Sequence, residues 1–132
     1  MSSKRIVLNS TKNFEIIDIT SRINQEIDIE FGIANIFSKH STSAIVVNEN
    51  EKGLLADLEL MLKDLVSDKN SWLHDRIDNN AKSHLKSFLL SSSETIPISN
   101  GKLDLGTWQS VFFIELDGPR KNRTINLTFI GD

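Results

Sequence analysis

Residues 95–130 read TIPISNGKLDLGTWQSVFFIELDGPRKNRTINLTFI, and they settle the fold class of the chain. Runs rich in β-branched and aromatic residues alternate here with glycine, proline and asparagine, which is typical of consecutive β-strands. Strands are expected at 95–99, 102–106, 108–116 and 123–130. A series of strands that follows helices predicts an α+β fold with mostly antiparallel sheets.

The first third of the chain adds strands to this sheet-rich half. They are expected at residues 4–8, 14–19, 33–38 and 43–48. Between them Thr20 is a candidate N-cap, and Ile23, Ile27 and Phe31 recur every four residues before Gly32. That spacing predicts a helix that starts at Thr20 and stops at the glycine.

The middle of the chain is expected to be helical. Leu54, Leu58, Met61 and Leu65 form an apolar stripe at helical spacing, with Asn48 or Asn50 as the N-cap. A second helix is expected over 79–90. The whole chain, residues 1–132, is therefore expected to form a single domain: a compact sandwich of mostly antiparallel sheets with two to three helices.

Bulk composition excludes several classes of protein. The chain has 132 residues, a net charge of -3 and no cysteine, so thiol catalysis, disulfides and thiolate metal sites are excluded. The negative charge gives no reason to expect nucleic acid or a membrane surface as a partner. The start of the chain lacks the long apolar core of a secretory signal, and a cytoplasmic location follows as the default.

Three histidines could carry chemistry, and they are His40, His74 and His84. Three imidazoles on different elements could occupy three corners of a zinc tetrahedron and leave the fourth for water or substrate. Their spacing matches no short zinc motif, however. The competing interpretation is that they are unrelated surface or capping residues.

Two further sets of residues are candidates for a binding site. Asn48 and Glu49 either end a strand and cap a helix, or place a general base at a helix N-terminus. Thr107 lies in a segment whose two glycines either serve a hairpin or let backbone approach a ligand. Arg120 and Arg123 are either solvated or act as fork-shaped donors to phosphate or carboxylate.

Taken in order, several motifs resemble the YjbQ family. They are HSTSAIVVNENE at 40–51, Asp57, WLH at 72–74, DNNAKSHL at 78–85 and IPISNGKLDLGTWQSVFFIELDGPR at 96–120. The resemblance spans about residues 5 to 131, and it implies a compact α+β fold, a homotrimer and a site that contains His40, His74 and His84. It also implies a weak thiamine-phosphate synthase activity, a transferase reaction that joins two phosphorylated heterocycles and releases pyrophosphate.

These observations lead to two functional hypotheses. The first is an enzyme with a histidine-lined pocket that binds zinc, or else magnesium, and acts on a phosphorylated small molecule. In this hypothesis the metal is held by His40, His74 and His84. The catalytic residues are Glu49, His40 and His84. The substrate is contacted by Thr42, Asn48, Thr107 and Arg120. The alternative is a module on a trimeric scaffold that binds a metal or a small anion without catalysis.

The strand at 108–116 gives a separate argument for assembly. One small core is not expected to bury Phe113 and all of its apolar neighbours. Subunit contacts are therefore expected to cover part of this strand. His40 and Glu49 lie at opposite ends of another short strand. At about 3.3 Å per residue they are expected to lie some 20 Å or more apart, so one of the two is expected to reach a shared pocket from a neighbouring subunit.

Overall fold

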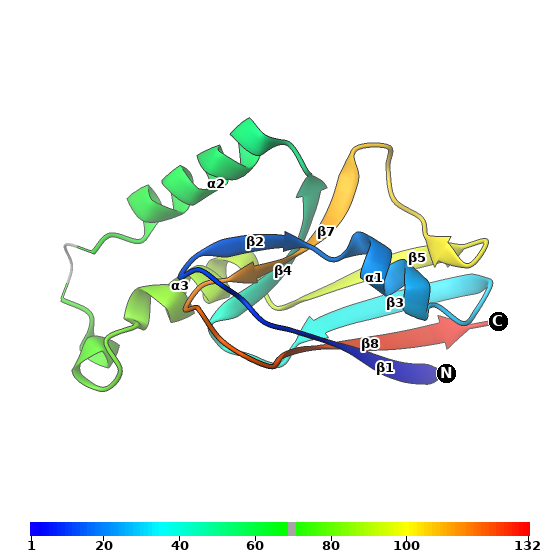
Figure 1. Cartoon of the computed structure of the whole chain (residues 1–132), viewed down its shortest axis with the longest axis horizontal. Coiled ribbons are helices and arrows are strands. Elements are labelled where there is room, and N and C mark those ends of the chain that lie inside the picture. Colours follow the sequence, from blue (N-terminus) through cyan, green and yellow to red (C-terminus); the bar gives the residue numbers. More distant parts are fainter. Residues whose placement is uncertain (69–70) are drawn as a thin grey trace.

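The computed structural model describes residues 1–68 and 71–132 and confirms an α+β architecture of antiparallel sheets (Figure 1). The elements are β1 (Ser2–Leu8), β2 (Glu15–Asp18), α1 (Thr20–Glu26), β3 (Phe31–Ser38), β4 (Ser43–Glu49), α2 (Lys52–Leu65), the short 3-10 helix η1 (Leu73–Arg76), α3 (Ala81–Leu90), β5 (Ser93–Ser99), β6 (Lys102–Leu103), β7 (Gln109–Glu115) and β8 (Arg123–Gly131). The α-helices of the described residues number three, at the upper end of the expected range.

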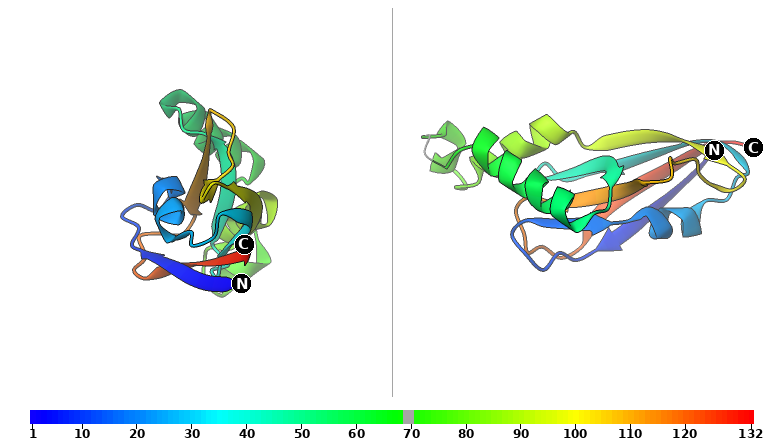
Figure 2. Two further views of the ribbon diagram at one scale, coloured as in Figure 1. Left: turned by 90° about the vertical axis from the view of Figure 1, so that its right-hand side faces the viewer. Right: turned by 90° about the horizontal axis from the view of Figure 1, so that it is seen from above.

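Two antiparallel sheets form the sandwich. The larger has the strand order β1-β8-β3-β5-β6, and the smaller has the order β2-β7-β4. Figure 2 views these layers from one end and from above. None of the helices in the described residues is long and apolar enough to cross a membrane.

The small sheet is buried on both faces, which explains the continuous apolar run in β7. Val111 and Phe113 pack into a core between the two sheets, to which α1 adds Ile23. Phe112 and Ile114 point the other way, into a second core with residues of α2 and α3. A strand covered on both faces reads as unbroken hydrophobic sequence.

Phe113 corrects one expectation from the sequence. Its side chain is 0% exposed within the single chain, so the expectation that a subunit contact is needed to cover it is wrong. The sequence argument assumed one core, whereas β7 contributes alternate residues to two. The large exposed apolar side chains lie elsewhere, mainly on α2, on α3 and on the outer face of β3.

The first helix is shorter than its sequence pattern predicts. α1 ends at Glu26, and Phe31 and Gly32 already belong to β3. Ile27 and Ile29 both pack against the core between the sheets, so a two-residue period prevails over the four-residue spacing in this segment. Gly32 lies opposite Gly131 of β8, and a side chain on either would collide with the backbone of the other strand.

The cap of α2 also differs from expectation. The carboxylate of Glu51 accepts hydrogen bonds from the backbone N–H groups of Gly53 at 2.6 Å and Leu54 at 3.0 Å. Asn50 instead donates its side-chain amide to Asp18. Glu51 therefore caps α2, a role that was expected of Asn48 or Asn50.

Candidate functional site

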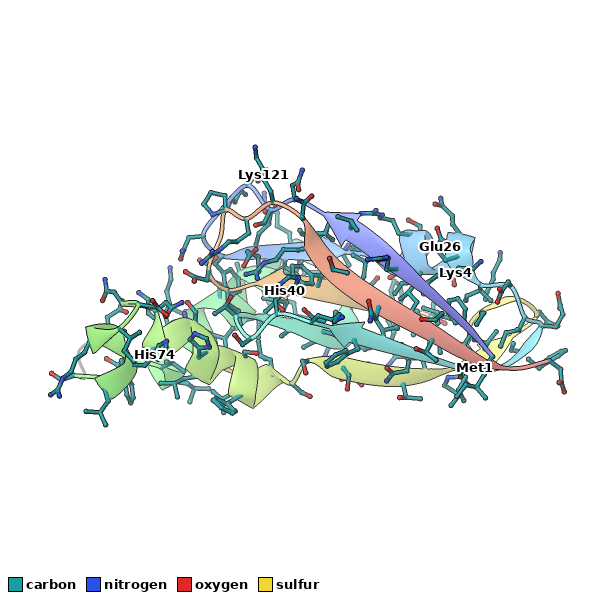
Figure 3. All side chains as sticks on the ribbon, turned by 90° about the horizontal axis from the view of Figure 1, so that it is seen from below. Met1, Lys4, Glu26, His40, His74 and Lys121 are labelled. Carbon is teal, nitrogen blue, oxygen red and sulfur yellow. The ribbon has the colours of Figure 1, made fainter. Side chains whose placement is uncertain are left out.

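The three histidines lie towards one end of the sandwich, on three different elements. His40 belongs to the connection between β3 and β4, His74 to η1 and His84 to α3. Figure 3 labels two of them, with His74 on the helical end of the molecule and His40 closer to the sheets. The rings of His74 and His84 meet edge to face, with their centroids 4.7 Å apart.

His84 lines two neighbouring cavities, one together with His40 and one together with His74. With His40 it lines a cavity of about 640 Å³, which we call the serine cavity. The residues around it are Phe37, Ser38, Lys39, His40, Ser41, His84, Ser87, Phe88, Ser91 and Ser92. His74 and His84 line a neighbouring, more apolar cavity of about 450 Å³ with Trp72 and Phe88. The structure therefore arranges the histidines as two pairs.

The lining of the serine cavity favours an anion. Five serines, one lysine and two histidines line it, and the lining includes no aspartate or glutamate. The hydroxyls of Ser38 and Ser87 already bond to Ser43, so the serines that favour an anion are Ser41, Ser91 and Ser92. Phosphate and carboxylate oxygens accept hydrogen bonds from hydroxyl and ammonium groups. Phe37 and Phe88 add two apolar rings, so the cavity could hold a small molecule with a charged end and a flat end.

Ser91 contributes an unusual backbone to this cavity. Its φ is 75° and its ψ is 160°, a region that residues with a side chain rarely adopt. Its carbonyl accepts a hydrogen bond from Ile45 of β4 at 3.2 Å, and its N–H donates to Ser87 at 2.9 Å. These two bonds fix the turn that leads from α3 into β5 and bring Ser91 and Ser92 to the cavity wall.

His40 is held by a backbone hydrogen bond. The N–H of Thr124, in β8, donates to Nε2 of His40 at 2.8 Å. Burial lowers the pKa of His40, and the nearby positive charge of Arg123 lowers it further, against the opposing effect of Glu115. Both influences favour the neutral imidazole.

A buried ion pair, Arg123 with Glu115, lies close enough to His40 to affect its pKa. Arg123 donates from Nε to Oε1 of Glu115 at 2.8 Å and from Nη2 to Oε2 at 2.5 Å. Ser10 donates to the same carboxylate at 2.6 Å. Burial raises the pKa of Glu115, but the hydrogen bonds from Arg123, Ser10 and the N–H of Asp117 outweigh it, so the pKa lies below its usual value.

Thr42 belongs to this buried network. Its hydroxyl accepts a hydrogen bond from Nη2 of Arg123 at 2.9 Å, and its side chain is buried. Thr42 does not line the serine cavity. Its observed contact is with Arg123, and the predicted contact between Thr42 and substrate stays a prediction.

Within the described residues of one chain, the three histidines are not arranged around a common metal position. Nε2 of His40 already accepts the Thr124 N–H, and Nε2 of His74 lies 3.7 Å from Asp78 without a hydrogen bond. Residues 1–68 and 71–132 contain no group of three or more histidine, aspartate or glutamate side chains arranged to hold a metal ion. The expected common centre of His40, His74 and His84 is thus not formed within the described part of one chain, and zinc or magnesium stays a prediction.

Glu49 and Asn48 lie at the far end of β4 from His40. They line a separate, largely apolar pocket of about 300 Å³ with Asp57 and residues of α2. The side-chain oxygen of Asn48 accepts the N–H of Glu49 at 2.8 Å. A strand of this length separates its ends by roughly 20 Å, so Glu49 cannot act in the serine cavity of its own chain.

Thr107 and Arg120 are both exposed and lie outside the serine cavity. Arg120 bonds to Asp117 through its Nη2 at 2.9 Å and through its Nε at 3.0 Å. Of the two arginines that the sequence singled out, Arg123 is the one that is buried, at 5% exposure. The alternation Arg123, Ile125, Leu127 places it on the inner face of β8, which is a signal that the sequence does contain.

Two antiparallel sheets, three α-helices and a serine- and histidine-lined cavity define a small α+β domain with a polar site at one end. The chain belongs to the UPF0047 YjbQ-like family, whose profile matches residues 4–132. A UPF0047 protein of Methanothermobacter thermautotrophicus is 50% identical over 132 residues, which cover 98% of this chain and 92% of the relative.

Solved structures show the same fold. A protein of unknown function from Sulfolobus solfataricus, described as YbjQ-like, superposes with a TM-score of 0.95 at 40% identity, covering 99% of this chain and 97% of the other. A hypothetical protein from Aeropyrum pernix gives a TM-score of 0.94 at 31% identity over the full length of both chains. The family is thereby established, and its names state no activity.

Proposed function

We propose that the serine cavity binds a small anionic molecule, with a phosphorylated substrate as the best fit. The observation that carries the proposal is the lining: hydroxyls, imidazoles and Lys39 without any carboxylate. A cavity of this size suits a ligand of metabolite or cofactor dimensions. The phosphate would face the serines, and a flat ring would pack against Phe37 or Phe88.

A pair of matched variants tests this proposal. His74 and His84 are neighbouring imidazoles, but only His84 lines the serine cavity. We expect His84→Ala to weaken the binding of inorganic phosphate and pyrophosphate, measured by isothermal titration calorimetry, while His74→Ala binds as the unchanged chain does. Thermal melts monitor the fold. Equal affinities in both variants would place the anion elsewhere, and no binding by the unchanged chain would refute the proposal.

A catalytic role extends the same proposal, and the family resemblance is its basis. In a thiamine-phosphate synthase reaction, a thiazole nitrogen attacks the methylene carbon of a pyrimidine diphosphate. The carbon–oxygen bond breaks and pyrophosphate leaves with its electron pair. Both reactants join a phosphate to a flat heterocycle, as the cavity lining suggests. Release of pyrophosphate by the unchanged chain but not by His84→Ala supports catalysis, and binding without turnover supports a non-catalytic anion-binding module.

Assembly into a homotrimer is the second part of the proposal. The observation that supports it is the set of exposed apolar side chains on α2, where Leu60 is 60% and Leu65 is 63% exposed. Patches of this kind mark interaction surfaces. In a trimer, Glu49 and Asn48 of one subunit could approach the serine cavity of the next, which would unite the two ends of β4 in one site.

Light scattering tests the trimer. The expected mass is about three times the 14.9 kDa of one chain. Leu60→Glu with Leu65→Glu is expected to lower the mass, because both substitutions place charge on the exposed face of α2. A monomer at micromolar concentration would refute the assembly, and an anion affinity unchanged in the monomeric variant would show that the cavity is complete within one chain.

A further inference from the structure

The hydrogen bond from Thr124 to His40 determines where the imidazole carries its proton. A backbone N–H always keeps its hydrogen, so Nε2, at 2.8 Å, must offer a lone pair. A neutral imidazole has a hydrogen on one nitrogen only, and in His40 this must be Nδ1. Among the described residues Nδ1 has no hydrogen-bond partner, and it is not among the buried unsatisfied atoms.

The surroundings of His40 oppose protonation of the ring. A proton on Nε2 would point at the N–H of Thr124 and break that bond. The charged and titratable groups that face the ring are Arg123 from β8, Glu115 from β7, Lys39 from its own connection and His84 across the cavity. Arg123 and Glu115 form a buried ion pair, so the carboxylate of Glu115 is not free to pair with an imidazolium.

We propose that His40 is a hydrogen-bond donor, through Nδ1–H, that binds and orients an oxygen of the anion in the serine cavity. This inference rests on the proposed function and deepens it, because it selects the ligand. A fixed donor binds groups that only accept, such as the ionised oxygens of phosphate or sulfate. It also removes two roles expected of His40: a general base needs a free lone pair, and a zinc ligand needs an unprotonated nitrogen that faces the metal.

Two substitutions separate the two nitrogens of the ring. In His40→Gln the side-chain amide reaches about as far as Nε2, so its oxygen can still accept from Thr124 while the Nδ1–H donor is lost. In His40→Asn the amide lies near the place of Nδ1, so a donor remains while the bond to Thr124 is lost. The inference predicts opposite outcomes. His40→Gln keeps the melting temperature but binds sulfate roughly 10-fold more weakly or worse, whereas His40→Asn melts earlier and binds more tightly than His40→Gln.

Sulfate is the probe because its charge is constant between pH 5.5 and 8. Nitrogen-15 spectra of the imidazole rings over the same range report the tautomer directly, with His40→Gln used to assign the His40 signals. The expected result is the Nδ1–H pattern of a neutral ring throughout, with and without sulfate. An Nε2–H tautomer, an imidazolium that forms on binding, or a His40→Gln variant with unchanged affinity would overturn the inference.

The same measurements distinguish failure of this inference from failure of the proposed function. If neither sulfate nor phosphate binds the unchanged chain, the proposed function fails and the binding role of His40 fails with it, although the spectra still show the Nδ1–H form. If the anions bind but His40 shows another protonation state, the proposed function stands and only the role of His40 is overturned.

Discussion

The buried pair of Glu115 and Arg123 gives the sharpest test of the energetics, through the substitution Arg123→Met. Glu115 is 0% exposed, and Arg123 supplies two of its hydrogen bonds, at 2.8 and 2.5 Å. Without Arg123, the contacts that the described residues leave to the carboxylate are those with Ser10 and the N–H of Asp117. Breaking a buried pair by removing one partner costs about 3–5 kcal/mol, because the remaining charge is left uncompensated.

Urea denaturation at pH 7 and one fixed protein concentration measures this loss of unfolding free energy. Adding Glu115→Gln to Arg123→Met removes the uncompensated charge, so the double variant should recover about 2 kcal/mol relative to Arg123→Met alone. A loss below about 1 kcal/mol in Arg123→Met, or no recovery in the double variant, would contradict the reasoning. The first result would mean that water reaches the carboxylate.

The pH dependence gives an independent check on the same pair. Because the pKa of Glu115 is lowered in the folded chain, its stabilising contribution is present above the ordinary glutamate pKa of about 4.3 and is lost as the pH falls through the lowered value. In Arg123→Met the burial remains while the hydrogen bonds that lower the pKa are gone. The deficit of the variant relative to the unchanged chain should therefore shrink on acidification, and a deficit that grows would contradict the assignment.

Three further substitutions test other features of the fold. Gly118→Ala should destabilise the chain by about 2–3 kcal/mol in thermal melts, because the added Cβ would lie 2.7 Å from Cγ of Glu115; a neutral result would mean that this loop can shift. Gly131→Ala would put a Cβ 2.6 Å from Cα of Gly32, so amide exchange in β3 and β8 should accelerate, and unchanged protection would refute the close approach. Ser91→Gly should raise the unfolding free energy by about 1 kcal/mol by relieving its positive φ, and a lower melting temperature would show that the hydroxyl makes a contact worth more than the strain.

Most of the fold could be predicted from local patterns, because burial imposes a period on the sequence. The alternation in β8 placed its strand correctly. The stripe on α2 also placed its helix correctly, although Leu54, Met61 and Leu65 of that stripe are exposed in the single chain. The prediction failed where apolar residues fit both a helical and a two-residue spacing. This is the case in the segment after Glu26, which was expected to continue the helix. It also failed for Phe113, since a run of apolar residues does not say how many cores it serves.

The candidate site was harder to predict, because it depends on which turns meet. The sequence indicated His40 and His84, and the structure places both in one cavity. Little in the sequence singles out Ser91. Its position follows from the backbone between α3 and β5 and from its hydrogen bond with Ile45. The separation of Glu49 from His40, by contrast, follows from strand geometry.

The length of β4 can change only in steps of two residues, because its side chains alternate between two cores. Ile45 and Val47 face the core between the sheets, and Ala44 and Val46 face the core under the helices. Inserting one residue would exchange these two sets, whereas inserting two residues, matched by two in β7, would preserve both cores. The gap between the histidine end and the acidic end of the strand can therefore change only by about 6.6 Å at a time, so proteins of this fold with a longer β4 should carry insertions of even length.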